Sequence, residues 1–271
     1  MGNTCFLVSL LADPQNILAT NWSTATSVCN WVGVSCGSRN LRVTALDISS
    51  LGLTGTIPPH LGNLSFLAWI AKLISAITNS LERFLEQLIT LYLGRNKLSG
   101  SISSSIINIS SLRRINLGPN QLSGSIPTIP RNTSSLIGIG LDTNNLTGEI
   151  PRQLALLAEL DCSFNKFAGR LPNEIGNLQH LQFFNMGPNN FTGFIPPSLF
   201  NSSTLRIISL GVNRLSGHLP LSSEFWLPKL EQIYLDGNEL SGPMPFSICS
   251  IRIYPRQAWQ FKIFTVAQST V

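Results

Sequence analysis

The sequence predicts a right-handed solenoid of stacked coils, with a parallel β-sheet on its concave face and short helical, 3-10 and irregular segments on its convex face. Two observations support this fold class. One frame, L-x-L-x-x-N-x-L-x-G-x-I-P, recurs along the chain, and a fixed period of this length is typical of repeat architectures. The asparagines of the frame are separated by 24, 24, 21, 24, 24 and 25 residues and lie at Asn96, Asn120, Asn144, Asn165, Asn189, Asn213 and Asn238.

Each part of the frame has a physical role. The two apolar residues of L-x-L point to the same side of a short strand and enter the core, because strand side chains alternate. The asparagine ends the strand, and its amide can bond turn backbone in its own coil and the next. The glycine permits a left-handed turn and the proline ends the step. This frame is that of a leucine-rich repeat and predicts strands at 91–93, 115–117, 139–141, 160–162, 184–186, 208–210 and 233–235, after an earlier copy at 46–58.

The frame fails in three places. Residues 68–87 do not fit it, and apolar residues there recur at helical spacing, so we expect a degenerate coil or a helix that interrupts the strand ladder. The coil around 154–159 is three residues short, and no frame continues beyond Pro245. We therefore divide the chain into an N-terminal cap at 1–40, repeats at 41–245 and an off-frame tail at 246–271.

Composition argues for a binding surface and against several other functions. Only 11% of residues are charged and 43% are apolar, which suits a long continuous core. The net charge is +5, but the basic residues are scattered, so we expect no nucleic-acid partner. We expect no metal, no cofactor and no catalytic site, because the histidines lie in different turns without a partner nucleophile, at His60, His180 and His218.

The spelling of the repeat and of the N-terminus resembles one family. The S/T-G-x-I-P step, together with DPQNILATNWSTATSVCNWVGVSC at 13–36, resembles plant leucine-rich-repeat receptor-like kinases and receptor-like proteins. The similarity is greatest to the subfamily of flagellin- and elongation-factor-sensing receptors, and covers roughly 13–67 and 88–246. The resemblance implies a non-catalytic extracellular ectodomain for a peptide or protein ligand, with a co-receptor ectodomain as a further partner, in defence or developmental signalling.

The same resemblance bears on the cysteines and on the location of the protein. It implies a disulfide between Cys29 and Cys36 in the cap, where the sequence alone leaves two free thiols as the alternative; Cys162 takes a core position of its strand. It implies an extracellular or apoplastic location, with membrane attachment only through a transmembrane part that this sequence lacks. Met1–Ala12 lacks the basic region of a signal peptide and reads as a truncated start. Glycosylation sequons occur at Asn21, Asn63, Asn108, Asn132, Asn145, Asn190 and Asn201.

Two other functions remain open at this point. The chain could be a secreted binding protein of the polygalacturonase-inhibitor type, or an inactive remnant of a receptor gene. In each binding hypothesis, the ligand surface consists of strand residues that point outward. Phe183 and Ile207 would form an apolar patch near Tyr234, unless a neighbouring loop covers them. The candidate ligand-binding residues are Tyr92, Arg114, Asn116, Asp161, Phe183, Asn185, Ile207 and Tyr234.

Overall fold

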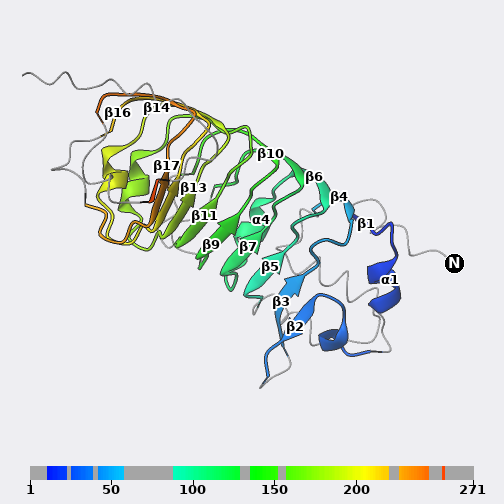
Figure 1. Ribbon diagram of the computed structural model, residues 1–271. Helices are drawn as coiled ribbons and strands as arrows, with labels where there is room; N and C mark the ends of the chain where they lie inside the picture. Colours follow the sequence, from blue (N-terminus) through cyan, green and yellow to red (C-terminus); the bar gives the residue numbers. More distant parts are fainter. Residues whose placement is uncertain are drawn as a thin grey trace, which may run out of the picture.

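The computed structural model shows a leucine-rich-repeat solenoid of parallel strands (Figure 1). It describes residues 11–22, 26–38, 42–57, 88–128, 135–151, 157–219, 226–243 and 252–253. The cap, with helix α1 and strand β2, lies at one end, and β14, β16 and β17 lie at the other. Each coil contributes a strand to one long sheet, then a strand to a second sheet, and in some coils a short helix.

The principal sheet is the feature that the frame predicts. It has ten strands in the described part of the chain, in the order β19-β17-β15-β13-β11-β9-β7-β5-β3-β2, and every pair but β2–β3 is parallel. The seven predicted strands are confirmed, each starting and ending one residue earlier than expected. Their bounds are Thr90–Tyr92 (β5), Arg114–Asn116 (β7), Gly138–Gly140 (β9), Glu159–Asp161 (β11), Phe183–Asn185 (β13), Ile207–Ser209 (β15) and Gln232–Tyr234 (β17).

A continuous core runs along the inner side of this sheet. The apolar residues of each L-x-L are buried. The apolar residue after the asparagine and the isoleucine or leucine of I-P are buried too, except Leu240 and Leu219 at the later end of the stack, which are partly buried. Cys162 takes the second strand position and is fully buried, as predicted for a small apolar residue. Large aromatic residues fill the core of the later coils, where Phe167 and Phe191 stack with ring centroids 6.3 Å apart. The core therefore belongs to the stack as a whole, because each coil covers the next.

The frame asparagines form a ladder of hydrogen bonds between coils. In the coil of Asn144, Oδ1 accepts from Leu122 N at 2.9 Å, and Nδ2 donates to Leu141 O at 3.1 Å and Leu117 O at 3.2 Å. Leu122 and Leu117 belong to the preceding coil, so the expectation that the amide serves the following coil is wrong in direction. The same acceptor bond recurs from the amides of Leu53, Leu98, Leu146, Phe167, Phe191 and Leu215 to Asn96, Asn120, Asn165, Asn189, Asn213 and Asn238.

A second sheet replaces part of the irregular convex side that the sequence predicted. It consists of two pieces, β1-β4-β6-β8-β10 and β12-β14-β16-β18, and it is broken beside the short coil. Its glycines adopt positive φ, for example 80° at Gly100 and 77° at Gly193, which only glycine takes without strain. The strands are Leu11–Ala12 (β1), Thr54–Thr56 (β4), Lys97–Ser101 (β6), Gln121–Gly124 (β8), Asn145–Leu146 (β10), Ala168–Gly169 (β12), Asn190–Phe194 (β14), Arg214–His218 (β16) and Glu239–Ser241 (β18). Helical segments follow at Ser104–Ile107 (α4), Asn173–Asn177 (η2) and Pro197–Phe200 (η3), as predicted.

The expected interruption of the strand ladder is wrong. Strand β3 (Val43–Asp47) pairs directly with β5, with Leu46 opposite Leu91, and β4 pairs directly with β6. Asn96 makes its ladder bonds to Leu53 and Ile48, across 43 and 48 residues of sequence. The predicted helix at 70–88 lies almost wholly outside the described residues, apart from Leu88, which is buried. The strand ladder is therefore continuous from β3 to β5.

The tail also departs from the expectation. Strand β19 (Arg252–Ile253) pairs in parallel with β17, Gln232 opposite Arg252, so the tail extends the principal sheet. This strand follows its neighbour after 20 residues, whereas the frame would require apolar residues at 257 and 259. Pairing of main-chain groups does not depend on the side-chain frame, so this strand has no frame signal in the sequence.

The cap closes the first coil with a disulfide and two tryptophans. Cys29 and Cys36 are bonded, which confirms the pairing that the resemblance implied. Trp22 and Trp31 stack with centroids 5.3 Å apart, and Trp22 Nε1 donates to Val32 O at 3.0 Å. Strand β2 (Val34–Cys36) covers the edge of β3 in antiparallel pairing. The remaining elements are α1 (Ile17–Asn21) and η1 (Val28–Asn30).

The asparagine ladder predicts a large effect of one amide. Asn144→Ala leaves the buried amide of Leu122 without its acceptor, while Leu117 O and Leu141 O each lose one donor and keep that of Asn120 or Asn165. We therefore expect a loss of about 2 kcal/mol in the free energy of unfolding. Urea unfolding followed by far-UV circular dichroism measures it. Gln121→Ala, at an exposed position of β8, is the control and should change stability by less than about 0.5 kcal/mol. Equal effects of the two variants would contradict the role of the ladder.

The cysteines predict a labelling pattern. In native secreted protein, iodoacetamide should modify neither Cys29 nor Cys36 before reduction, since the bond closes them. Cys162 should react only after unfolding, because it is fully buried and burial raises the pKa of its thiol, leaving little thiolate. Peptide mapping by mass spectrometry reads out all three sites. Alkylated Cys29 and Cys36 in the native protein would refute the disulfide, to which we assign about 2–3 kcal/mol.

Candidate functional site

The outward face of the principal sheet carries two rows of side chains, as the frame predicts. Residues of neighbouring strands stand opposite one another in register, so each frame position forms a line across the sheet. All eight candidate residues lie on these lines and are half-buried. One line reads Thr90, Arg114, Gly138, Glu159, Phe183, Ile207 and Gln232, and the other reads Tyr92, Asn116, Gly140, Asp161, Asn185, Ser209 and Tyr234.

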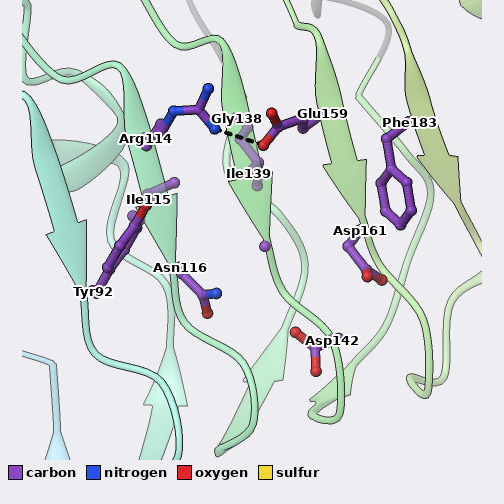
Figure 2. A pocket seen from close by; sticks show the side chains of 11 residues that line it. Tyr92, Arg114, Ile115, Asn116, Gly138, Ile139, Asp142, Glu159, Asp161 and Phe183 are labelled. Atoms are coloured by element: carbon purple, nitrogen blue, oxygen red, sulfur yellow. Dashed lines mark hydrogen bonds and ion pairs between the residues drawn. The ribbon is translucent and has the colours of Figure 1, made fainter. Parts of the chain in front are cut away.

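A hollow of about 180 Å³ opens in this face above β9 (Figure 2). The central strand β9 has no outward side chains there, because both of its outward residues, Gly138 and Gly140, are glycines. The flanking strands β7 and β11 supply charged and polar walls, and the next strands on each side supply aromatic residues. The side chains that form the walls are Tyr92, Arg114, Asn116, Asp142, Glu159, Asp161 and Phe183.

An ion pair crosses one end of the hollow. Arg114 Nη1 lies 2.7 Å from Glu159 Oε2, although the two residues stand on strands separated by β9. Gly138 has no side chain between the two residues. A Cβ there would lie 3.4 Å from Arg114 Cγ and from Glu159 Oε2, which is already van der Waals contact, so a side chain larger than that of alanine would compete with the ion pair for space. The hydrogen bond that Arg114 donates to Glu159 raises the pKa of Arg114, against a smaller opposing effect of burial. Both side chains remain partly exposed, so the pair positions groups more than it stabilises the fold.

Two carboxylates lie toward the other end of the hollow. Asp161 is fixed by three hydrogen bonds, from Ser163 N at 3.0 Å, Ser163 Oγ at 2.6 Å and Asn185 Nδ2 at 3.2 Å. Asp142 follows β9, and the pKa of its carboxyl is raised by burial and secondarily by the charge of Asp161, while Arg95 acts in the opposite sense. The hollow therefore has a surplus of negative charge, in a chain whose net charge is +5.

The hollow unites five of the eight candidates: Tyr92, Arg114, Asn116, Asp161 and Phe183. Asn185, Ile207 and Tyr234 lie outside its lining, although Ile207 stands opposite Phe183 and so extends the apolar surface. Tyr234 donates its hydroxyl hydrogen to Gln232 at 3.0 Å. Gly140 and Glu159 lie on the outward rows that the frame predicts but are not among the eight candidates, and Gly138 and Asp142 were not expected at the site. The available signal was the run G-I-G at 138–140, which places two glycines where the other coils carry side chains.

The described sequons lie away from this face. Asn21, Asn108, Asn145, Asn190 and Asn201 are exposed, and Asn108 and Asn201 follow the helical segments α4 and η3. Asn63 and Asn132 lie outside the described residues. A glycan on any of the five described sites would leave the outward face of the principal sheet uncovered.

Other chemistry is sparse in the described parts of the chain. There the structure groups no three His, Cys, Asp or Glu residues in a way that could hold a metal ion, and it has no helix that is long and apolar enough to cross a membrane. One expectation needs correction: His218 does have a hydroxyl neighbour, since its Nδ1 lies 3.2 Å from Ser241 Oγ. Both side chains are exposed, and the serine hydroxyl also lies within hydrogen-bond reach of Gly217 O at 3.3 Å. This pair lies in water, without the enclosed setting that activates a nucleophile.

Family models recognise two parts of the chain. The leucine-rich-repeat N-terminal domain matches residues 6–37. The leucine-rich repeat matches 42–64, 87–109, 156–178 and 229–251. The matched segments therefore comprise the cap and four of the coils.

Known proteins with similar sequence or structure include plant receptor kinases. A probable leucine-rich-repeat receptor-like serine/threonine-protein kinase of Arabidopsis thaliana is 42% identical over 59 residues, which is 22% of this chain and 6% of that protein. The Arabidopsis receptor kinase HAESA, solved with the peptide hormone IDA and the co-receptor SERK1, aligns with a TM-score of 0.54 and 28% identity over 90% of this chain and 51% of that one. A plant ice-binding protein aligns with a TM-score of 0.62 and 25% identity, over 82% and 66% of the two chains.

The similar structures bind different kinds of partner on the same fold. A hormone receptor and an ice-binding protein share the solenoid, so the fold alone does not define the ligand. The match covers only a small part of the curated relative's length. The chain therefore has a leucine-rich-repeat N-terminal domain followed by leucine-rich repeats, and is similar to the ectodomains of plant leucine-rich-repeat receptor kinases.

Proposed function

We propose that this chain is a non-catalytic binding unit, which takes a peptide or protein ligand on the outward face of its principal sheet. The observation that supports it best is the hollow above β9, where aromatic and charged side chains gather around a strand without side chains. Aromatic and arginine residues supply most of the binding energy at protein interfaces. A rigid stack of strands presents them with little loss of conformational entropy on binding.

The similarity to receptor kinases supports the class of ligand and the location. HAESA was solved with a peptide hormone and a co-receptor, and its ectodomain fold extends over most of this chain. By this analogy the protein acts at the extracellular face of the plasma membrane or in the apoplast, and a co-receptor ectodomain is a second partner. The disulfide of the cap supports this location, because such bonds persist in oxidising compartments.

The biological role that we propose is perception of a peptide in defence or developmental signalling. The cap sequence at 13–36 favours the subfamily of flagellin- and elongation-factor-sensing receptors. The exposed asparagines of the described sequons, on sides other than the binding face, are the proposed glycosylation sites, and we extend this proposal to Asn63 and Asn132.

The proposal predicts which variants lose binding. Random twelve-residue peptides selected on the secreted protein serve as the probe, and biolayer interferometry measures their dissociation constants. Alanine at each of four anchors should raise the dissociation constant at least about tenfold, because each removes a large contact group. The anchors are Tyr92, Arg114, Phe183 and Tyr234.

Variants on the opposite side provide the control. Asn108→Ala and Asn201→Ala, at exposed positions after α4 and η3, should leave the dissociation constants unchanged. Binding that survives loss of all four anchors, or falls with the two control variants, would show that this face is not the binding site.

A further inference from the structure

The hollow above β9 limits what kind of group can enter it. Its floor is main chain only, since Gly138 and Gly140 have no side chains, and its volume of about 180 Å³ suits one long side chain. Asn116 lies close over Gly140, where a Cβ would approach Asn116 Nδ2 to 3.2 Å. The space that remains lies between Asn116 and Asp161 and toward Asp142, as Figure 2 shows.

The charges around this space are unequal. Arg114 is occupied by Glu159 at 2.7 Å, so the pair contributes little net charge to the hollow. Asp142 and Asp161 then remain as two carboxylates in the lining of the hollow. The pKa of Asp142 is raised first by burial and then by the charge of Asp161, and the charge of Arg95 acts weakly in the opposite sense. The carboxylate of Asp142 accepts a side-chain hydrogen bond from the Thr143 hydroxyl, which is long at 3.3 Å. A cation between the two carboxylates would relieve this repulsion and the cost of burying Asp142.

A metal ion is a poor candidate for that cation. The described residues bring no third carboxylate, histidine or cysteine to a common centre with these two. A guanidinium or ammonium group is better suited, because it carries several donors and forms charge-assisted bonds with carboxylates. Its aliphatic stem can lie on the bare strand β9, as such stems do on apolar surfaces.

The aromatic walls indicate how a ligand would run. Tyr92 and Phe183 stand on β5 and β13, at opposite sides of the hollow in Figure 2. Four strand spacings of about 4.8 Å place them roughly 19 Å apart. An extended peptide that crosses the strands covers this distance in about six residues. The two aromatic residues can therefore contact apolar side chains that flank a central cationic residue.

We propose that the hollow is a subsite for an arginine or lysine side chain of a peptide ligand, with its charged head between Asp142 and Asp161. This inference rests on the proposed function and adds the chemistry of one ligand residue. It assigns ligand contact to Asp142 and an indirect role to Gly138 and Gly140, which keep the subsite open.

The test uses synthetic peptides taken from the selected library. In each peptide, arginine is replaced by citrulline, a neutral group of the same shape, or lysine by norleucine. On the wild-type protein we expect the dissociation constant to rise about tenfold, as for other close charge pairs at interfaces. On Asp142→Asn the same replacement should cost clearly less, about threefold, because one of the two carboxylates that hold the charged head is gone and Asp161 remains.

Matched variants separate this subsite from general effects. Asp236 has the same frame position as Asp142, two residues before the asparagine of its own coil. The main-chain carbonyl of Asp236 accepts from Asn238 at 3.3 Å, and that of Asp142 accepts from Asn144 at 3.2 Å. Asp236→Asn should therefore preserve the tenfold difference. Gly138→Val should close the hollow and abolish the preference for the cationic peptide, whereas Thr90→Val, at the same position of β5, should retain it.

The outcomes distinguish the two proposals. Peptides that lose affinity with the anchor variants but show equal citrulline effects on wild type and Asp142→Asn would overturn the cationic subsite and leave the proposed function standing. Peptides without any arginine or lysine requirement would do the same. A library that yields no peptide dependent on the principal sheet would overturn the proposed function, and the subsite with it.

Discussion

The hydrogen bonds of the frame asparagines determine the rest of this structure. Each of the seven frame strands ends in a turn whose amide and carbonyl groups lie between coils, where side chains rather than water must satisfy them. One asparagine side chain supplies an acceptor and two donors, and it connects its own coil to the preceding one. Among the described residues, every buried side-chain nitrogen or oxygen has a partner. The ladder thus fixes the spacing of the coils, and this spacing keeps the strands of the principal sheet in a regular arrangement.

This regularity explains how a binding site arises from a repeat. The frame keeps every inward position apolar, but it leaves the outward positions free to vary. Two glycines at the outward positions of β9 create a gap in an otherwise filled face, and the rows then place charged and aromatic residues around it. The ion pair between Arg114 and Glu159 spans the same gap. A local loss of side chains therefore creates a site that no single coil contains.

The stack also tolerates irregular sequence better than the frame suggests. Strands β3 and β5 pair directly although 42 residues separate Asp47 from Thr90, and β19 joins the sheet without a frame of its own. Sheet edges bond through main-chain groups, so any segment that reaches the edge in extended form can continue or close the ladder. The short coil, in contrast, breaks the second sheet between β10 and β12 while the principal sheet passes through it.

The sequence by itself determined the solenoid, the seven frame strands, the outward rows that contain Tyr92 and Phe183, and the buried state of Cys162. These features repeat with a fixed period, and side-chain alternation in a strand converts that period into a face. Only the tertiary structure decided the second sheet, the direction of the asparagine bonds, the direct pairing of β3 with β5, and the meeting of Asp142 with Asp161 in one hollow. These features depend on which segments become neighbours across coils, and contacts between distant residues leave no local period in the sequence.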